Sequence, residues 1–333
     1  MIQAGKLPNT LLADLLASLS INDRSLIVPP GVGQDTAVVD LDRETYLVLK
    51  SDPITFASDR IGFYAVNVNA NDIATAGATP RWFLATVLLP PGTAENQVRD
   101  ICRDLNSACA RLGVTLCGGH TEVTDAVNRP VISGSLIGIV DRKNLVLKEN
   151  MREGDTLIMT KSAGFEGTSV IAREFAVKLL EGGMPRRKID QGRAFLDRIS
   201  VVCEAKMAMR TGHVTAMHDV TEGGVSTALL ELSRAGGNKL AVHLDRIPIH
   251  QCTREICSIC GLDPLGLIGS GSLLMTVAAA VDKEIIRQLT DSGVDGTIIG
   301  SVAGEGYGIK AFENNVAATL PEFEVDELTR LFT

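Results

Sequence analysis

Hydrophobic side chains recur with helical spacing in several segments, and short apolar runs lie between them. The clearest case is a helix predicted over 94–112, which has one apolar stripe and ends at Gly113. That stripe consists of Val98, Ile101, Leu105, Ala108 and Leu112. Further helices are predicted over 11–19, 59–76, 168–180 and 224–235, and strands over 37–39, 46–49, 114–117, 131–140, 156–160, 240–244, 272–281 and 297–302. The alternation predicts a mixed α/β (α+β) protein, and it is too irregular to require a parallel Rossmann sheet.

The chain is long enough to need more than one core. It has 333 residues, which favours two domains. The stretch 141–155 is the most charged and least periodic part of the middle of the chain. We therefore predict an N-terminal domain over 1–145 and a C-terminal domain over 146–333.

Composition narrows the class of protein. A net charge of -8 argues against general nucleic-acid binding, which needs a basic surface. No segment has the roughly 18 apolar residues of a membrane helix, and the N-terminus lacks a signal-peptide pattern. Seven cysteines without a repeated framework fit a reducing compartment. We expect a soluble cytoplasmic protein with neither nucleic-acid nor membrane partners.

One acidic residue lies where apolar residues are expected. On the helix predicted over 59–76, Asp72 shares a stripe with Ile61, Ala65, Val68 and Ala76. A carboxylate on that stripe must be paired, hydrogen-bonded or bound to a cation, because burying an unpaired charge is costly. A ligand role and a simple Arg or backbone partner at the rim of the core both stay open on the spacing alone.

Three more aspartates lie at strand ends or glycine turns. Asp35 follows Gly31-Val32-Gly33, Asp52 follows a predicted strand, and Asp219 lies between a strand and a helix. Magnesium is usually held by a few carboxylates together with substrate phosphates. The four aspartates would form such a set if they converge, although an aspartate in a turn commonly serves the turn itself.

Two glycine clusters are candidate ligand loops. The first contains Gly118, Gly119, His120, Thr121 and Glu122 after a predicted strand. The second, residues 161–168, runs from Lys161 into a helix whose N-terminus would attract an anion. It lacks the Gly-Lys-Ser/Thr end of a Walker loop. Each cluster can equally be a turn, and His120 can equally be a structural histidine.

Two other patterns are weaker. Cys252, Cys257 and Cys260 have the spacing of an iron–sulfur ligand set, but residues 253–259 look helical, which favours structural thiols. Gly31-x-Gly33 lacks the third glycine and the helix of a dinucleotide fingerprint.

Five motifs in order carry a family resemblance. They are Gly31-Val32-Gly33-Gln34-Asp35-Thr36-Ala37, Ser51-Asp52, Asn71-Asp72-Ile73-Ala74 with Gly77-Ala78-Thr79-Pro80, Gly118-Gly119-His120-Thr121, and His218-Asp219-Val220-Thr221-Glu222-Gly223-Gly224. This series resembles the superfamily of aminoimidazole ribonucleotide (AIR) synthetase (PurM), selenophosphate synthetase (SelD), thiamine-monophosphate kinase (ThiL) and the hydrogenase maturation factor HypE. The resemblance covers nearly the whole chain, and Gly261-Leu262-Asp263-Pro264-Leu265 looks most like the HypE branch.

The resemblance implies a PurM-like fold of two domains, a homodimer paired through N-terminal strands, and bound ATP with Mg²⁺. It implies that magnesium or bridging acids are Asp35, Asp52, Asp72 and Asp219. Residues lining the nucleotide would be Gly33, Asn71, Gly118, Gly119 and Thr121. The chemistry implied is activation of a small acceptor by phosphoryl transfer, with candidate catalytic residues Glu122, His120 and Lys161.

The chain also departs from the HypE pattern. HypE relatives usually end in a Pro-Arg-Ile-Cys tail, whereas this sequence ends Leu328-Thr329-Arg330-Leu331-Phe332-Thr333. His120 and Glu122 replace the Asp and Lys of a Gly-Asp-Thr-Lys motif, Ser270 stands where an acid is common, and Gln34 replaces an acid beside Asp35. We therefore expect a HypE-like ATP-dependent enzyme (phosphotransferase-, ligase- or dehydratase-like) acting on a small acceptor. The alternative is a nucleotide-binding accessory protein that works through a maturation-protein partner.

Overall fold

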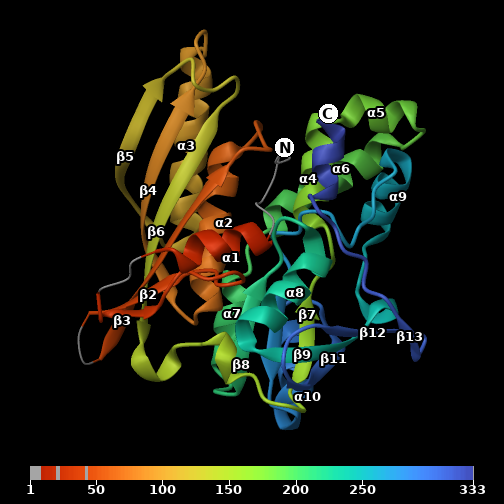
Figure 1. Ribbon diagram of the computed structural model, residues 1–333. Coiled ribbons are helices and arrows are strands. Elements are labelled where there is room, and N and C mark those ends of the chain that lie inside the picture. Colours follow the sequence, from red (N-terminus) through yellow and green to blue (C-terminus); the bar gives the residue numbers. More distant parts are fainter. Residues whose placement is uncertain (1–8, 20–22, 42–43, 333) are drawn as a thin grey trace. The chain divides into compact units, whose positions relative to one another are not determined.

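The computed structural model describes residues 9–19, 23–41 and 44–332, and the chain forms two units (Figure 1). Unit 1 contains the described residues of Met1–Asn22, the segment Pro30–Gln34, and Val146 onward. Unit 2 contains Asp23–Pro29 and Asp35–Leu145. Each unit has a sheet of its own.

Unit 2 is built on a six-stranded sheet. Its strands are β1 (Leu26–Val28), β2 (Ala37–Asp40), β3 (Thr45–Ile54), β4 (Thr79–Leu89), β5 (Thr115–Val123) and β6 (Val131–Asp141). Their spatial order is β1-β2-β3-β6-β4-β5. Neighbouring strands are antiparallel except β4 and β5, which run parallel and leave β5 at the edge of the sheet.

Two helices, α2 (Ile61–Thr75) and α3 (Glu95–Leu112), pack on this sheet and on each other (Figure 1). Every residue of α2 is buried, and it contacts β3, β4 and β6 as well as α3. Gly62 permits the close approach, because a Cβ atom there would lie 2.8 Å from the backbone nitrogen of Leu105. The single apolar stripe of α3 faces inward, and Gly113 ends the helix with a left-handed φ of 68°. Both helices confirm the predictions from periodicity.

Unit 1 is built on a seven-stranded sheet. Its strands are β7 (Thr156–Thr160), β8 (Val214–Asp219), β9 (Asn238–His243), β10 (Leu273–Val277), β11 (Gly296–Glu305), β12 (Ile309–Glu313) and β13 (Val316–Ala318). The order is β13-β12-β9-β11-β7-β10-β8, and only the β12–β9 pair is parallel among the pairs described. The helices of unit 1 are α1 (Asn9–Ala17), α4 (Phe165–Glu174), α5 (Ala176–Glu181), α6 (Arg186–Ala194), α7 (Val202–Met209), α8 (Gly224–Gly236), α9 (Gln251–Cys260) and α10 (Asp282–Asp291).

The mixed α/β class predicted from the sequence is confirmed, but some elements differ. The helix predicted over 168–180 is two helices, α4 and α5, which break at Phe175. The strand predicted over 272–281 ends at Val277 and is followed by a short 3-10 helix, Ala279–Val281. The strand predicted over 114–117 continues as β5 to Val123, so Gly118 and Gly119 lie within a strand. Strands β1, β4, β12 and β13 were not predicted from the hydrophobic pattern.

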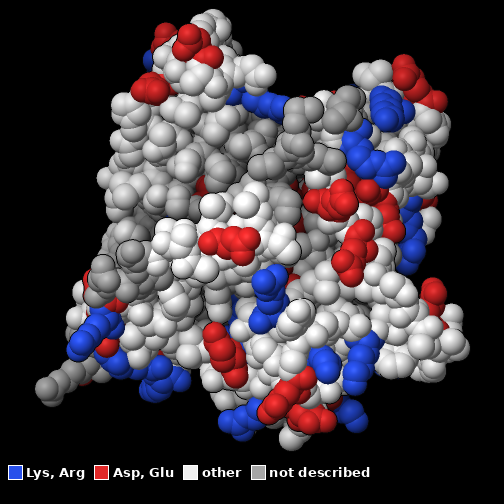
Figure 2. Space-filling model, viewed as in Figure 1, with Lys and Arg blue, Asp and Glu red and all other residues white. Residues whose placement is uncertain are grey.

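Charged side chains are mixed on the surface. On the face drawn in Figure 2, both basic and acidic side chains are seen. Within the described residues, no helix combines the length and the apolar character needed to cross a bilayer.

Candidate functional site

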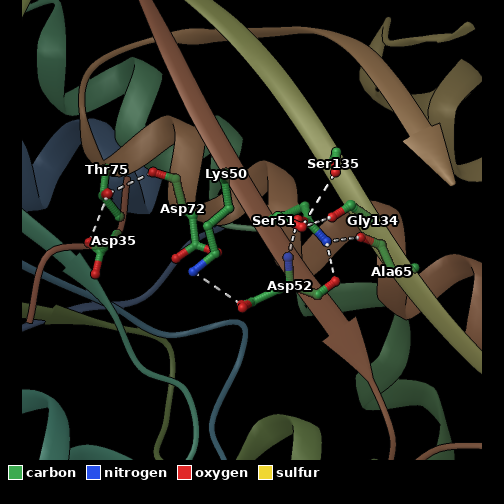
Figure 3. A network of polar contacts seen from close by, with 10 residues as sticks. Asp35, Lys50, Ser51, Asp52, Ala65, Asp72, Thr75, Gly134 and Ser135 are labelled. Carbon is green, nitrogen blue, oxygen red and sulfur yellow. Dashed lines mark hydrogen bonds and ion pairs between the residues drawn. The ribbon is translucent and has the colours of Figure 1, made fainter. Parts of the chain in front are cut away.

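A lysine and two aspartates form the centre of a polar network in unit 2 (Figure 3). The Nζ atom of Lys50 lies 3.2 Å from Oδ2 of Asp52 and 3.3 Å from Oδ2 of Asp72. The side chain of Asp72 is only 3% exposed, whereas that of Asp52 is 33% exposed. The carboxylate on the apolar stripe of α2 is therefore paired with a lysine from strand β3.

Thr75 brings a third aspartate into the same network. Its hydroxyl lies 2.9 Å from Oδ2 of Asp35 and 2.7 Å from the backbone oxygen of Asp72 (Figure 3). A hydroxyl has one proton to donate, so the two acceptors share it. Asp35 is buried, with 8% of its surface exposed. Three of the four predicted metal ligands, Asp35, Asp52 and Asp72, are thus gathered around Lys50 and Thr75.

Asn69 fixes the backbone of Asp52 against helix α2. Its Oδ1 accepts the N–H of Asp52 at 2.9 Å, and its Nδ2 donates to the backbone oxygens of Asp52 and Ala65 at 3.3 and 2.8 Å. A Cβ atom on Gly134 of the neighbouring strand would lie 2.6 Å from that Nδ2. A side chain at Gly134 would have to displace this amide, which holds the backbone of Asp52.

Strand β3 is pinned to β6 at the same level. The hydroxyl of Ser51 donates to the backbone oxygen of Gly134 at 2.9 Å. The hydroxyl of Ser135 in turn donates to the hydroxyl oxygen of Ser51 at 3.4 Å (Figure 3). Lys50, Asn69 and Thr75 were not identified as functional candidates from the sequence. The available signal was polarity inside a buried helix, since Asn67, Asn69 and Asn71 recur on α2 in an apolar setting.

The fourth predicted ligand, Asp219, belongs to unit 1. It ends strand β8 and is fully buried. Its neighbour His218 lies with Nε2 3.2 Å from Oε2 of Glu231 on α8. The loop that follows Asp219 reaches α8 through Gly223 and Gly224, which have left-handed φ values of 83° and 65°. These glycines are required, because a side chain at either position would be strained.

Lys161, a candidate catalytic residue, is held by its surroundings. Its Nζ donates to the backbone oxygens of Arg198 and Ser200 at 2.8 and 2.7 Å, and lies 2.5 Å from Oε1 of Glu204. These three acceptors match the three protons of an ammonium group. Burial lowers the pKa of Lys161, and the charge of Glu204 opposes that shift. This geometry favours a structural role.

The glycine pair of β5 has a local structural reason. The β4–β5 pairing slips by one residue, because Leu116 pairs with Phe83 and Gly118 with Leu84. A Cβ atom on Gly119 would lie 1.9 Å from the backbone oxygen of Ala85. The extra residue is a β-bulge, and the glycines allow the strands to close up after it.

The remaining candidates on β5 are exposed. His120 and Glu122 point to the same face of the sheet, and Nε2 of His120 lies 3.0 Å from Oε2 of Glu122. Their side chains are 64% and 49% exposed. Thr121 lies between them and pairs with Val87. These three side chains are open to a ligand or to another chain.

Gly33 and Asn71 lie in different units. Gly33 has a φ of +81°, and a Cβ atom there would lie 2.5 Å from the backbone oxygen of Glu231 within unit 1. Close packing therefore gives this glycine a structural reason. Asn71 is fully buried on α2, one residue before Asp72.

The three clustered cysteines all lie on α9. Burial raises the pKa of Cys252 to about 11 and that of Cys257 to about 12, and it also raises the pKa of Cys260. Metal-binding thiols are deprotonated, which these environments disfavour. The helix and the raised pKa values favour structural thiols.

Two buried acids that the sequence analysis did not single out lie in unit 1. Burial raises the pKa of Glu166, at the start of α4, to about 7, and hydrogen bonds from Ser270 oppose the shift. Burial also raises the pKa of Asp326 to about 7 against hydrogen bonds from the backbone of Gly223 and Leu328. Glu166 lay in a noted glycine loop, but nothing in the local sequence marked Asp326.

Fold and motifs together define a chain of the AIR synthase type. Residues 33–140 match the N-terminal domain model of AIR synthase related proteins, and residues 152–310 match the C-terminal domain model. The chain belongs to this family.

Within the family, the chain is similar to HypE proteins. It is 28% identical over 320 residues to a Methanocaldococcus jannaschii protein named as a hydrogenase expression/formation protein, covering 92% of this chain and 90% of that one. A solved HypE–HypF complex matches with a TM-score of 0.78 and 21% identity, over 94% of this chain and 99% of the other. A structure of HypE in complex with ATP matches with a TM-score of 0.70 and 20% identity, over 94% and 91%. At these identities, the structural matches show the shared two-domain fold.

Proposed function

We propose that this chain binds ATP with Mg²⁺ and activates a small acceptor by phosphoryl transfer. The observation that carries the proposal is the network around Lys50, where the carboxylates of Asp35, Asp52 and Asp72 gather. Lys50 contacts Asp52 and Asp72, and Thr75 connects Asp35 to Asp72. Several carboxylate oxygens in one place form a donor set that a divalent cation could use together with substrate phosphates.

The donors in this network fit magnesium. They are carboxylate oxygens of different burial, with Asp52 the most exposed of the three. Magnesium takes hard oxygen ligands, and it usually keeps several waters and binds substrate phosphates. When bound, it would neutralise charge on a triphosphate. The chain's own part is positional, because Asn69 holds the backbone of Asp52 while Thr75 holds Asp35 to α2.

The remaining assignments follow from the family. Asp219 is proposed as a further acid for the metal nucleotide, and the nucleotide would be lined by Gly33, Asn71, Gly118, Gly119 and Thr121. The HypE structure solved with ATP supports a nucleotide as the ligand. His120 and Glu122 are the catalytic candidates that remain accessible to a substrate.

Calorimetry with ATP and magnesium tests the proposal. We expect the parent protein to bind, and Asp72→Asn to bind at least about tenfold more weakly, because it loses a charged ligand. The matched control is Asp104→Asn, another acid of unit 2, which pairs with Arg60 at 2.8 Å. It should bind like the parent. The proposal fails if the parent releases no binding heat, or if a folded Asp72→Asn variant binds equally well.

A second candidate function is that of an accessory protein that binds nucleotide and works through a protein partner. The match to the HypE–HypF complex favours it. In that case, ATP turnover by the isolated chain should be slow and unaffected by small acceptors, and a copurifying partner should change it. Phosphorus NMR of ATP with a panel of acceptors separates the two functions, since steady product formation without a partner supports the enzyme.

We further propose that the chain forms a homodimer through unit 2. Strand β5 is a nine-residue edge strand that ends at Val123, which is 61% exposed. Leu84 on the neighbouring strand β4 is 41% exposed. An edge strand of this length is a site for pairing with another chain. Light scattering should give twice the chain mass, and Val123→Lys should lower it. Val316→Lys, an exposed position on β13 of the other sheet, is the control and should leave the mass unchanged.

A further inference from the structure

The last segment of the described chain is packed into unit 1. Asp326 and the 3-10 helix Glu327–Leu331 follow a short irregular stretch. Asp326 is 2% exposed and Leu328 is 1% exposed. Phe323 lies flat over Gly266, where a Cβ atom would come within 2.6 Å of its ring. Such burial is unusual for an acidic stretch and shows that it performs a structural task.

Two neighbouring acids of this segment hold two different loops. Oδ2 of Asp326 accepts the N–H of Gly223 at 2.6 Å, across 103 positions of sequence. Oε2 of Glu327 accepts the N–H of Asp263 at 2.8 Å, and the N–H of Glu327 donates to the oxygen of Gly266 at 3.1 Å. Asp326 therefore contacts the loop that follows Asp219, and Glu327 contacts the loop 263–266, whose Leu265 oxygen accepts the N–H of Ser226 at 3.1 Å.

The bond to Gly223 lies at a sensitive place. Gly223 is the residue before α8, whose first backbone N–H groups have no partner within the helix. A carboxylate at a helix N-terminus satisfies such a donor and interacts favourably with the helix dipole. The loop has two successive left-handed glycines, and its backbone is also held at Thr221, whose oxygen accepts the N–H of Gly224 at 3.1 Å and the N–H of Gly269 at 3.2 Å. Asp326 supplies from a distance the cap that the local sequence lacks.

We propose that Asp326 is a positioning residue for the loop Thr221–Gly224 and thereby for the magnesium nucleotide. The inference rests on the proposed function, in which Asp219, directly before this loop, is a further acid for that ligand. The C-terminal segment is then part of the binding machinery although it contributes no ligand of its own.

The test compares Asp326→Asn with Glu327→Gln. Both are buried acids of one segment, and each loses a charge while keeping an oxygen acceptor. Hydrogen bonds to charged groups are worth more than those to neutral groups, so at pH 8, above the pKa of about 7 to which burial raises Asp326, we expect Asp326→Asn to raise the Kd for ATP with magnesium about tenfold. Glu327→Gln should raise that Kd clearly less, even if it lowers the melting temperature. Equal changes in Kd for both variants, or none for Asp326→Asn, overturn the proposal.

Hydrogen exchange provides a readout that does not depend on nucleotide. Peptides covering 221–224 should exchange about tenfold faster in Asp326→Asn than in the parent, and peptides covering 263–266 should do so in Glu327→Gln. If Asp326→Asn does not fold, Asp326→Glu keeps the charge and should show a smaller change at 221–224. Unchanged exchange at 221–224 in both Asp326 variants excludes the positioning role. If the loop loosens as expected but the parent binds no ATP, the proposed function fails and the effect on nucleotide binding fails with it.

Discussion

Two regions of the molecule, the network at Lys50 and the acids near Glu166, bury carboxylates in different ways. In unit 2, the carboxylate of Asp72 lies 3.3 Å from the ammonium of Lys50. In unit 1, Glu166 and Asp326 form no ion pair within the described residues, and burial raises the pKa of each to about 7. The charges that act on Glu166 are those of other acids, Asp326 and Glu222.

The difference separates acids that contact a cation from acids whose described neighbours are other acids and hydrogen-bond donors. An acid paired with a cation stays ionised and can exchange its partner for a metal. An acid without a cation takes up a proton near neutral pH instead. The network at Lys50 is therefore the better metal candidate, and the acids around Glu166 couple the stability of unit 1 to pH.

The largest expected effect concerns a buried acid of unit 1 that, like Asp72, is paired with a lysine. Lys161 and Glu204 are both 4% exposed and form such a pair. Lys161→Met should cost about 4 kcal/mol of unfolding free energy, because it leaves the charge of Glu204 buried and unpaired. Denaturant titration measures this cost. Adding Glu204→Gln should recover much of it, whereas a loss below about 1 kcal/mol would contradict the pairing.

The same variant tests the catalytic candidate. At a temperature where Lys161→Met remains folded, its affinity for ATP with magnesium should equal that of the parent, since the ammonium is fully used by Arg198, Ser200 and Glu204. A loss of turnover larger than the loss of folded protein would indicate that Lys161 has a catalytic role.

The second prediction applies the same change to unit 2. Lys50→Met should destabilise the protein by about 3 kcal/mol, somewhat less than Lys161→Met because the side chain of Lys50 is 18% exposed. Magnesium should restore part of the stability if it replaces the ammonium. Thermal melts with and without magnesium measure both effects. Asp52→Asn is the control, and it should cost less than about 1 kcal/mol, as its carboxylate is partly exposed.

The third prediction concerns pH and Glu166. A folded pKa of about 7 lies above the ordinary value of 4.5, so the folded state holds the proton more tightly than the unfolded state does. The stability from this group is fully present below pH 4.5 and is lost as pH rises to about 7. Glu166→Gln cannot ionise, and it should exceed the parent by about 3 kcal/mol at pH 8.

Unfolding curves at pH 5 and pH 8 measure this difference. The gap between Glu166→Gln and the parent should be small at pH 5 and widen by pH 8. Glu181→Gln, an exposed acid of α5, is the control and should show no such widening. A gap that is constant with pH would mean that Glu166 is ionised throughout this range.

These regions also show what the sequence could predict. Helices α2 and α3 were predicted because their apolar spacing is long and regular, and the stripe on α2 indicated that Asp72 needs a partner. The identity of that partner, Lys50, depends on how β3 and α2 pack, which no local pattern encodes. The hydrogen bond by which Asp326 caps α8 at Gly223 joins residues 103 positions apart, and it could not be predicted from the sequence either.

Local misreadings had local causes. Strand β4 was not predicted because it begins with Thr79-Pro80, and proline is disfavoured within sheets. The break between α4 and α5 at Phe175 has no glycine or proline to mark it. Gly118 and Gly119 were predicted to form a ligand loop or a turn after the strand, whereas they lie within β5, after a register shift. The glycine pair indicates that another part of the backbone comes close, and the fold shows that this part is strand β4.

The smallest expected effect comes from the exposed pair on β5. His120 and Glu122 lie 3.0 Å apart like the buried pairs, but water screens them. A double-mutant cycle with His120→Ala and Glu122→Ala should give a coupling energy below about 0.5 kcal/mol at neutral pH. If these residues act on substrate, turnover should fall while stability does not. A coupling as large as that of Lys50 and Asp72 would show that burial does not explain the difference between the two kinds of pair.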